Sequence, residues 1–361
     1  MTRHPYASLP DHCFWRQAIA ERPPAEIDPV ISAKFQLCPT DRVATAGSCF
    51  AQHIARYLRQ SGFNYFVTET AHPLVPEHLA DQFGYGVFSA RFGNIYTSRQ
   101  LLQLLRRAYG LFAPAEDVWR RDDGRLIDPY RPRLQPQGFA SAAEYEADRR
   151  QHFAAARRMV EEMDVFVFTL GLTEGWVSRE DGAAFPLCPG VAGGAFNPDR
   201  HAFLNLRAAE VVTDMRQAFD FIRARNRHVR LIVTVSPVPL IATAENRSVL
   251  VSTTYSKAAL RVACEELSAG HDDVAYFPSY EIITGNYARS RYFAGDLRSV
   301  TEEGVAHVMR LFLAHYTEAD ASSSDVSEVA PRDNSAAEAV EQLAVMKKVV
   351  EVICDEESLT R

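Results

Sequence analysis

Short apolar runs alternate with longer segments of helical periodicity along most of the chain. The runs at 164–170 and 231–235 consist almost entirely of aliphatic, β-branched or aromatic residues. Such runs are typical of strands that are covered on both faces in a parallel sheet. A shorter run of the same kind lies at 274–277, and a short strand at 41–46 is closed by a glycine-serine pair. The pattern therefore predicts four buried strands.

Helices are predicted between these strands. After the first strand, Ile54 and Leu58 recur at helical spacing until Gly62, a residue type that commonly ends helices. Strands that alternate with helices indicate an α/β fold, in which a doubly wound parallel sheet is the middle of three layers. The other predicted helices lie at about 201–226, 254–269 and 301–316.

Two regions depart from this alternation. Residues 64–140 are less regular, with a predicted helix at 98–109 and a stretch rich in proline, arginine and glycine at 124–138. We interpret them as an insertion or lid. After Tyr316 the composition becomes polar and serine-rich, which predicts a disordered linker. The expected organisation is an N-terminal extension (1–34), an α/β domain (35–316), a linker (317–335) and a C-terminal helix (336–361).

The predicted C-terminal helix is amphipathic, because its apolar residues recur at steps of three and four. Such a helix docks onto its own chain, forms a dimer, or recruits another protein, and the pattern leaves these alternatives open. The residues of the apolar stripe are Val340, Leu343, Met346, Val350 and Ile353.

The charge of the chain is concentrated in its tail. The 361 residues carry a formal net charge of −7, and the eleven acidic and four basic residues of 317–361 account for all of it. The body is neutral by count, so no nucleic-acid partner is expected. Without a secretory signal or a run of 18 apolar residues, the expected location is the cytoplasm, with no membrane span.

No motif for a bound group was found in the chain. The six cysteines have no zinc-ligand spacing and are expected to be free thiols. The phosphate-binding loop, the dinucleotide glycine fingerprint and the zinc-protease motif are missing too. We therefore expect neither a metal nor another cofactor.

Polar residues follow three of the predicted strands, at 47–49, 171–174 and 236–239. Ligands of open α/β sheets bind at these carboxyl ends of the strands. A serine after a strand most often caps a helix. At a glycine turn, however, its hydroxyl is exposed, and its own N–H points to where a helix N-terminus would hold an oxyanion. Ser48 is thus a candidate nucleophile.

The motif around Ser48, Gly-Ser-Cys-Phe-Ala at 47–51, resembles the one that names the GSCFA family of bacterial proteins. The resemblance covers about residues 35–316, and the family is similar to the SGNH/GDSL esterase superfamily. It implies an SGNH-hydrolase-like (flavodoxin-like) fold and acyl-ester chemistry, but no particular substrate. The further blocks that resemble the family lie at 92–97, 169–176, 234–239 and 277–281.

The resemblance implies roles for individual residues. Ser48 occupies the position of the nucleophile, and Gly93, with Asn94 beside it, resembles the block whose glycine N–H helps to bind the oxyanion. The block at 171–174 begins with Gly171 and carries Thr173 in place of the asparagine that donates to the oxyanion. Its last residue, Glu174, is expected to accept a hydrogen bond or to position substrate.

The last superfamily block, Asp-x-x-His, is incomplete in this chain. Asp296 supplies the acid, but Ser299 stands where the histidine base is expected. A serine needs a base within hydrogen-bond reach to become nucleophilic. The prediction is that Asp296 orients His307 on the following helix. The open alternatives are His53, His72, Asp296 itself as base, and Cys49 as a second nucleophile.

The expected function is hydrolysis or transfer of an O-acyl ester, with acetyl as the acyl group and a carbohydrate as the acceptor. In this hypothesis, the N–H groups of Ser48 and Gly93 stabilise the oxyanion with help from Thr173. Two alternatives remain open: a thioester-dependent O-acyltransferase of polysaccharide assembly, and a non-catalytic SGNH-like fold that binds a glycan or a protein.

Overall fold

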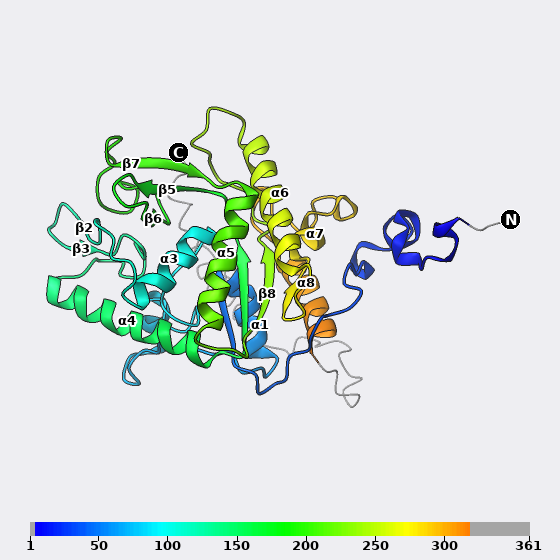
Figure 1. The fold of residues 1–361 in the computed structure, drawn as a ribbon, viewed down its shortest axis with the longest axis horizontal. Helices are drawn as coiled ribbons and strands as arrows, with labels where there is room; N and C mark the ends of the chain where they lie inside the picture. Colours follow the sequence, from blue (N-terminus) through cyan, green and yellow to red (C-terminus); the bar gives the residue numbers. More distant parts are fainter. Residues whose placement is uncertain (1–3, 318–361) are drawn as a thin grey trace, which may run out of the picture.

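A parallel sheet of four strands, in the order β1-β4-β8-β9, forms the centre of the protein (Figure 1). The computed structural model describes residues 4–317. All four predicted strands are present, and an α/β fold is confirmed. Every residue of β1 and β4 is buried, and for β4 the continuous apolar run predicted this. The strands are β1 (Val43–Gly47), β4 (Val165–Leu170), β8 (Arg230–Val235) and β9 (Val274–Tyr276).

Helices cover both faces of this sheet (Figure 1). Alternate residues of β4 point to opposite sides, so that Val165 and Val167 join one hydrophobic core while Phe166 and Phe168 join the other. The first core contains α1 (Phe50–Gln60), α7 (Ser279–Thr284) and α8 (Glu302–Tyr316). The second contains α3 (Ser98–Ala108), α4 (Ala142–Glu162), α5 (Ala208–Arg223) and α6 (Val249–Ser268).

The order in which strands are added to the sheet reverses at β1. On the outer side of β1, Tyr65 forms a one-residue parallel bridge with Val43. Asn64 accepts the N–H of Val43, whose own carbonyl accepts the N–H of Phe66. The chain therefore passes from β1 to 64–66 on one side and then to β4 on the other. In doubly wound sheets, ligands bind at the carboxyl ends of the strands where the order reverses.

Two small antiparallel sheets lie beside α3 and α4, at the left of the view in Figure 1. The three-stranded one has the order β6-β5-β7, and its central strand β5 begins four residues after β4 ends. The other pairs β2 with β3. The bounds are β2 (Trp119–Arg120), β3 (Leu126–Ile127), β5 (Glu174–Ser178), β6 (Ala184–Phe185) and β7 (His201–Asn205). The short helix α2 (Glu77–Gln82) precedes α3 in the chain.

Several predicted boundaries need correction. The helix expected over 201–226 begins as strand β7, and α5 starts only at Ala208. The helix expected at 98–109 is present as α3, but it packs against α5 in the second core. This part of the 64–140 insertion is therefore built into the helical layer. Helix α4 was not predicted.

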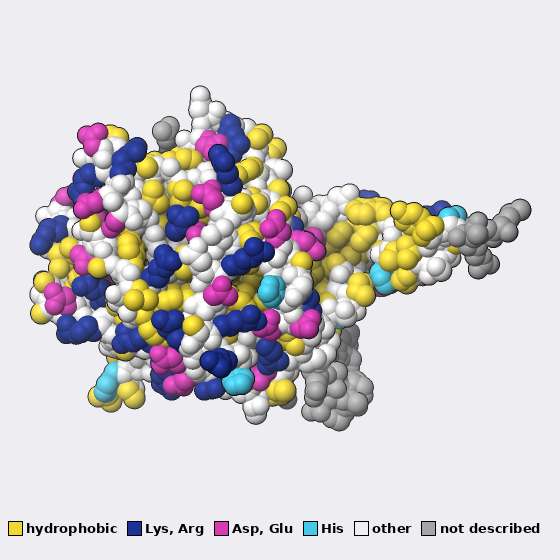
Figure 2. Space-filling model, viewed as in Figure 1, with side chains coloured by type: hydrophobic (Ala, Val, Ile, Leu, Met, Phe, Trp, Pro, Cys, Tyr) yellow, Lys and Arg dark blue, Asp and Glu magenta, His cyan; other side chains and the backbone are white. Residues whose placement is uncertain are grey.

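The N-terminal extension projects from the domain (Figure 1), and its last part returns to the domain surface, where Ile27 and Val30 are buried. Of the predicted linker the structure describes only Thr317, and the predicted C-terminal helix lies outside the described residues. Among the described residues, no helix is long and apolar enough to cross a membrane. On the face shown in Figure 2, acidic and basic side chains are interspersed, in keeping with the neutral body.

Candidate functional site

Ser48 lies at the carboxyl end of β1, in a turn that only glycine allows. Gly47 has a φ of +132°, and a Cβ atom there would lie 2.2 Å from the carbonyl oxygen of Thr169. This close approach lets the Ser48 N–H donate to the same carbonyl at 3.1 Å. The turn therefore ties Ser48 to the end of β4. The Ser48 N–H is thus already engaged in this conformation, and its role in stabilising an oxyanion stays a prediction.

The hydroxyl of Ser48 is buried without a partner. The residue is 3% exposed, and its Oγ forms no hydrogen bond within the described chain. Gly171 packs directly against it, since a Cβ on Gly171 would lie 3.0 Å from the Cβ of Ser48. The N–H of Gly171 donates to the Tyr96 carbonyl at 3.0 Å. A buried hydroxyl without a partner costs free energy, and such groups are retained mainly where they serve a function.

A buried lysine reaches the same turn from α6. Lys257 is 1% exposed, and its Nζ donates to the carbonyl oxygen of Gly171 at 2.7 Å. The ammonium is thus one hydrogen bond away from the glycine that packs against Ser48. The preceding residue, Ser256, accepts the Thr173 N–H at 3.0 Å. The Ser256-Lys257 pair therefore braces the loop after β4.

The loop at 93–95 lies beside the Ser48 turn, because the Ile95 N–H donates to the Gly47 carbonyl at 2.8 Å. Gly93 has a φ of +69°, and its N–H donates to no acceptor within residues 4–317. The Asn94 side chain accepts a hydrogen bond from Gln52 of α1 at 3.3 Å. The structure thus brings Gly93 and Asn94 to the end of β1, where the family resemblance placed them.

Two residues of the next block have other roles than expected. The Thr173 hydroxyl donates its proton to Asn205 Oδ1 at 2.7 Å in this conformation, and its role at an oxyanion stays a prediction. Both carboxylate oxygens of Glu174 accept the hydroxyl of Thr243. Burial raises the pKa of Glu174, although the bond from Thr243 opposes this shift. Thr173 thus fixes the start of β5 to the end of β7, and Glu174 fixes it to Thr243.

The predicted pair of Asp296 and His307 does not form. Asp296 is exposed and binds only its own turn, accepting the N–H groups of Arg298 and Ser299 and the Ser299 hydroxyl at 2.6 Å. Slight burial raises the pKa of Asp296, but these bonds outweigh it and lower the pKa. His307 lies 2.7 Å from the Tyr292 hydroxyl and 3.0 Å from the Ile27 carbonyl through its two ring nitrogens. Its helix face is turned to the N-terminal extension, and its role as base stays a prediction.

The other candidate residues are not bonded to Ser48 Oγ either. His72 is exposed and accepts the N–H of Leu74. His53 packs against Phe50 in α1, with a ring-centroid distance of 5.6 Å. Cys49 is half-buried at the start of α1.

His53 makes the stability of the fold sensitive to acid. Burial, together with the nearby Arg56, lowers the pKa of His53 to about 4, and Glu302 opposes this shift. In the unfolded chain the ring titrates near 6.5. The stability it contributes is present above that pH and is lost as the pH falls toward 4, by about 3 kcal/mol. We expect His53→Gln to remove this part of the pH dependence in urea unfolding at pH 7.5 and 4. The same substitution at exposed His78 controls for the loss of a histidine, and equal curves for both variants would refute the assignment.

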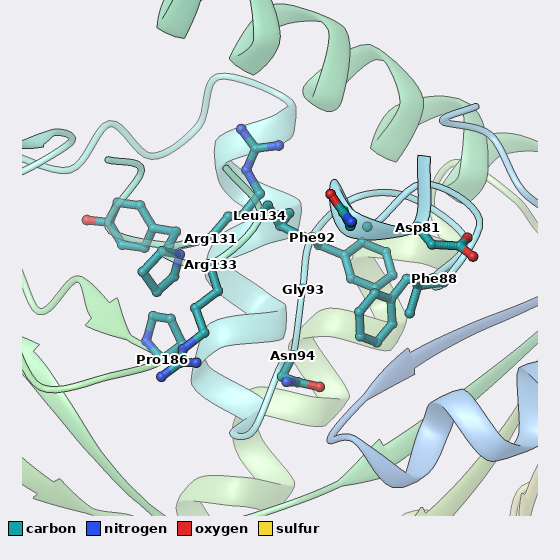
Figure 3. Close-up of a pocket in the computed structure, with 14 residues that line it drawn as sticks. Asp81, Phe88, Phe92, Gly93, Asn94, Arg131, Arg133, Leu134 and Pro186 are labelled. Atoms are coloured by element: carbon teal, nitrogen blue, oxygen red, sulfur yellow. The ribbon is translucent and has the colours of Figure 1, made fainter. Parts of the chain in front are cut away.

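Gly93 and Asn94 also line a cavity (Figure 3). Asn94 and Arg133 reach the same end of it, and the rings of Phe88 and Phe92 line another side. Ser48 does not line this cavity. The part of the chain that the structure describes contains no cluster of three or more histidine, cysteine or acidic side chains that could hold a metal ion.

The GSCFA family model matches residues 42–312, about three quarters of the chain. The chain belongs to the GSCFA family. The matched range begins just before β1 and ends within α8, so it contains the Ser48 turn, the 93–95 loop and Lys257. No curated protein matches the chain. Membership of the family therefore confirms the resemblance seen in the sequence and adds no substrate.

Sequence reasoning missed the part played by Lys257. Serine-lysine spacing along the chain gave no signal, because Lys257 meets the Ser48 turn only through the tertiary contact with Gly171. A weak signal was available in composition. Lys257 and Lys34 are the only two lysines before the acidic tail, in a chain that otherwise uses arginine.

Proposed function

We propose that this protein is a serine-dependent enzyme with an SGNH-like arrangement that hydrolyses or transfers an O-acyl ester. The observation that carries the proposal is the buried, unpartnered Oγ of Ser48 at the point where the strand order reverses. An acetyl group is the simplest acyl group for such a site, and a carbohydrate hydroxyl is the proposed acceptor or leaving group.

In this proposal Ser48 attacks the ester carbonyl carbon through Oγ. The proton of the hydroxyl passes to the neutral amine of Lys257, which must first turn from the Gly171 carbonyl to within hydrogen-bond reach of Oγ, because the two groups are not bonded in this structure. Lysine is a residue type that serves serine nucleophiles where histidine is absent. The N–H of Gly93 and the amide of Asn94 donate to the oxyanion. When the tetrahedral intermediate collapses, the ammonium returns the proton to the leaving alkoxide. Water or an acceptor hydroxyl then releases the acyl group from Ser48 by the same steps.

Lys257 is assigned as the base because the side chains expected for this role have other hydrogen-bond partners. Asp296 and Ser299 satisfy each other, and His307 is held by Tyr292 and Ile27. Lys257 is the basic side chain that binds the same glycine on which Ser48 packs. Buried amines give up their proton more readily than exposed ones, which suits them to act as general bases.

Covalent labelling by a fluorophosphonate probe tests this proposal without a choice of substrate. We expect the probe to modify the wild-type chain on the peptide that contains Ser48, as located by mass spectrometry. Ser48→Ala should lose this label, whereas Ser61→Ala, at an exposed position just after α1, should keep it. A failure to label Ser48, under conditions that label a serine esterase fully, would favour the non-catalytic alternative.

A further inference from the structure

A second, inner cavity is also lined by Asn94, and two of its polar side chains have unused hydrogen-bonding capacity that the proposed reaction does not employ. Arg107 of α3 and His152 of α4 both line it. Its volume of about 30 Å³ has room for about two water molecules or one carboxylate group. It adjoins the outer cavity of Figure 3, because the two share the lining residues Phe92, Asn94, Tyr130, Arg131 and Pro186.

Arg107 is a buried cation whose N–H donors have no acceptor. It is 7% exposed, and within residues 4–317 its guanidinium forms no hydrogen bond or ion pair. It lies over two aromatic rings, with Cζ 3.7 Å from the centroid of Tyr130 and 5.3 Å from that of Phe153. Burial lowers the pKa of Arg107, although Asp128 opposes this shift. A guanidinium offers five donors in a planar fork, so a large capacity for binding is left unused.

Arg131, which lines the same cavity, differs from Arg107 in that its guanidinium is engaged in hydrogen bonds. Its guanidinium donates to Asp128 at 2.8 Å, to Asp148 at 2.7 Å and to the carbonyl oxygen of Arg91 at 3.4 Å. The carboxylate that would serve Arg107 is thus already bound to Arg131. An acceptor for Arg107 must come from outside the described chain.

His152 provides an acceptor that faces the same cavity. It is 1% exposed, its Nδ1 lies 2.8 Å from Glu69 Oε2, and its Nε2 has no partner within the described chain. Burial raises the pKa of Glu69, but His152, Arg131 and the main-chain N–H of Arg91 outweigh this and lower it to about 2. Because Glu69 is ionised, Nδ1 carries the ring proton and donates it. Burial lowers the pKa of His152, so Nε2 keeps its lone pair.

We propose that the inner cavity binds the anionic group of a small hydroxylated acid, which enters through the outer cavity. Two oxygens of a carboxylate or phosphate accept the guanidinium fork of Arg107, and a hydroxyl next to the anionic group donates to His152 Nε2. Planar bidentate binding is the geometry for which arginine is suited. Ser48 lines neither cavity, and binding here does not depend on the acyl-transfer proposal, although Asn94 belongs to both sites.

Isothermal titration calorimetry of the full chain with three probes tests the ligand class. D-Glucuronate carries a carboxylate and hydroxyls, D-glucose 6-phosphate carries a phosphate, and D-glucose carries neither anion. We expect saturable binding of at least one of the two anions and none of D-glucose at the same concentration. The anion that binds identifies the source of the charge. Absence of binding by both anions, or equal binding of D-glucose, would overturn the proposal.

Matched variants and a crystal structure locate the site. Arg107→Met should weaken binding of the anion by about tenfold or more, since a hydrogen bond between charged groups is lost. Arg106→Met, one residue earlier on α3 and bound at the surface to Gln217, should bind as the wild type does. Equal affinity of Arg107→Met would refute the site. If this variant fails to fold, a wild-type crystal grown with the anion decides, because the anion must lie within hydrogen-bond distance of Arg107.

Discussion

Ser48→Ala should reduce kcat/KM for p-nitrophenyl acetate by about three orders of magnitude or more, because it removes the nucleophile. The substitution should cost little stability. The hydroxyl forms no hydrogen bond in the folded state, so its removal eliminates the free-energy cost of burying an unpaired polar group. We therefore expect a melting temperature equal to that of the wild type or slightly higher. Activity and stability would then move in opposite directions.

The exposed residue Ser61 provides the control for this prediction, since Ser61→Ala removes a hydroxyl 13 positions later on the other side of α1. This variant should keep the wild-type rate. An unchanged rate in Ser48→Ala would exclude serine catalysis of this ester. A lower melting temperature in step with the loss of activity would instead assign Ser48 a structural role.

The β1–turn–α1 unit shows why part of the site was predictable from sequence. The features that place Ser48 are local: an apolar strand, a glycine that must approach Thr169, and a helix that starts at Phe50. Each of them is specified by neighbouring residues, so the pattern along the chain reveals them. The same is true of β4, where six consecutive buried residues form a run that no other element matches.

The base could not be predicted, because helix direction and burial are set by the whole fold. His307 has the spacing expected of a residue near Asp296, but α8 turns this face to Ile27 and Tyr292. Lys257 lies 86 positions from Gly171 along the chain, and only the packing of α6 on the sheet brings them together. Because Ser299 replaces the histidine of the last block, the neighbouring sequence does not indicate which side chain accepts the proton of Ser48.

The prediction that a helix starts near residue 201 was wrong for a related reason. Residues 201–205 pair with β5, and this antiparallel pairing stabilises a strand that the sequence alone does not distinguish from the start of a helix. The strand matters to the site because Asn205 takes up the Thr173 hydroxyl. The hydroxyl expected to serve an oxyanion is thus bonded, in this conformation, to a residue of a strand that the sequence did not predict.

Lys257→Met should lower kcat for the same ester by about two orders of magnitude or more, the range that a general base contributes. Methionine keeps the unbranched shape of the buried side chain but can neither accept a proton nor donate to the Gly171 carbonyl. The KM should change much less than kcat, because the amine acts on Ser48 and not on the substrate. Steady-state kinetics of the purified variant measures both constants, and circular dichroism reports whether the variant is folded.

Lys257→Arg distinguishes the role of Lys257 as a base from its structural role in holding the Gly171 loop. An arginine can still donate to the carbonyl of Gly171, but it stays protonated and cannot act as a base. If Lys257 is the base, this variant should be as inactive as Lys257→Met, and only the wild type should lose activity as the pH is lowered through the range in which the amine gains its proton. If Lys257 only braces the loop, the arginine variant should recover most of the rate with the wild-type pH profile. Lys34→Met is the matched control, since the Lys34 amine also donates to main-chain carbonyls, those of Ser268 and His271, and its loss should leave kcat unchanged.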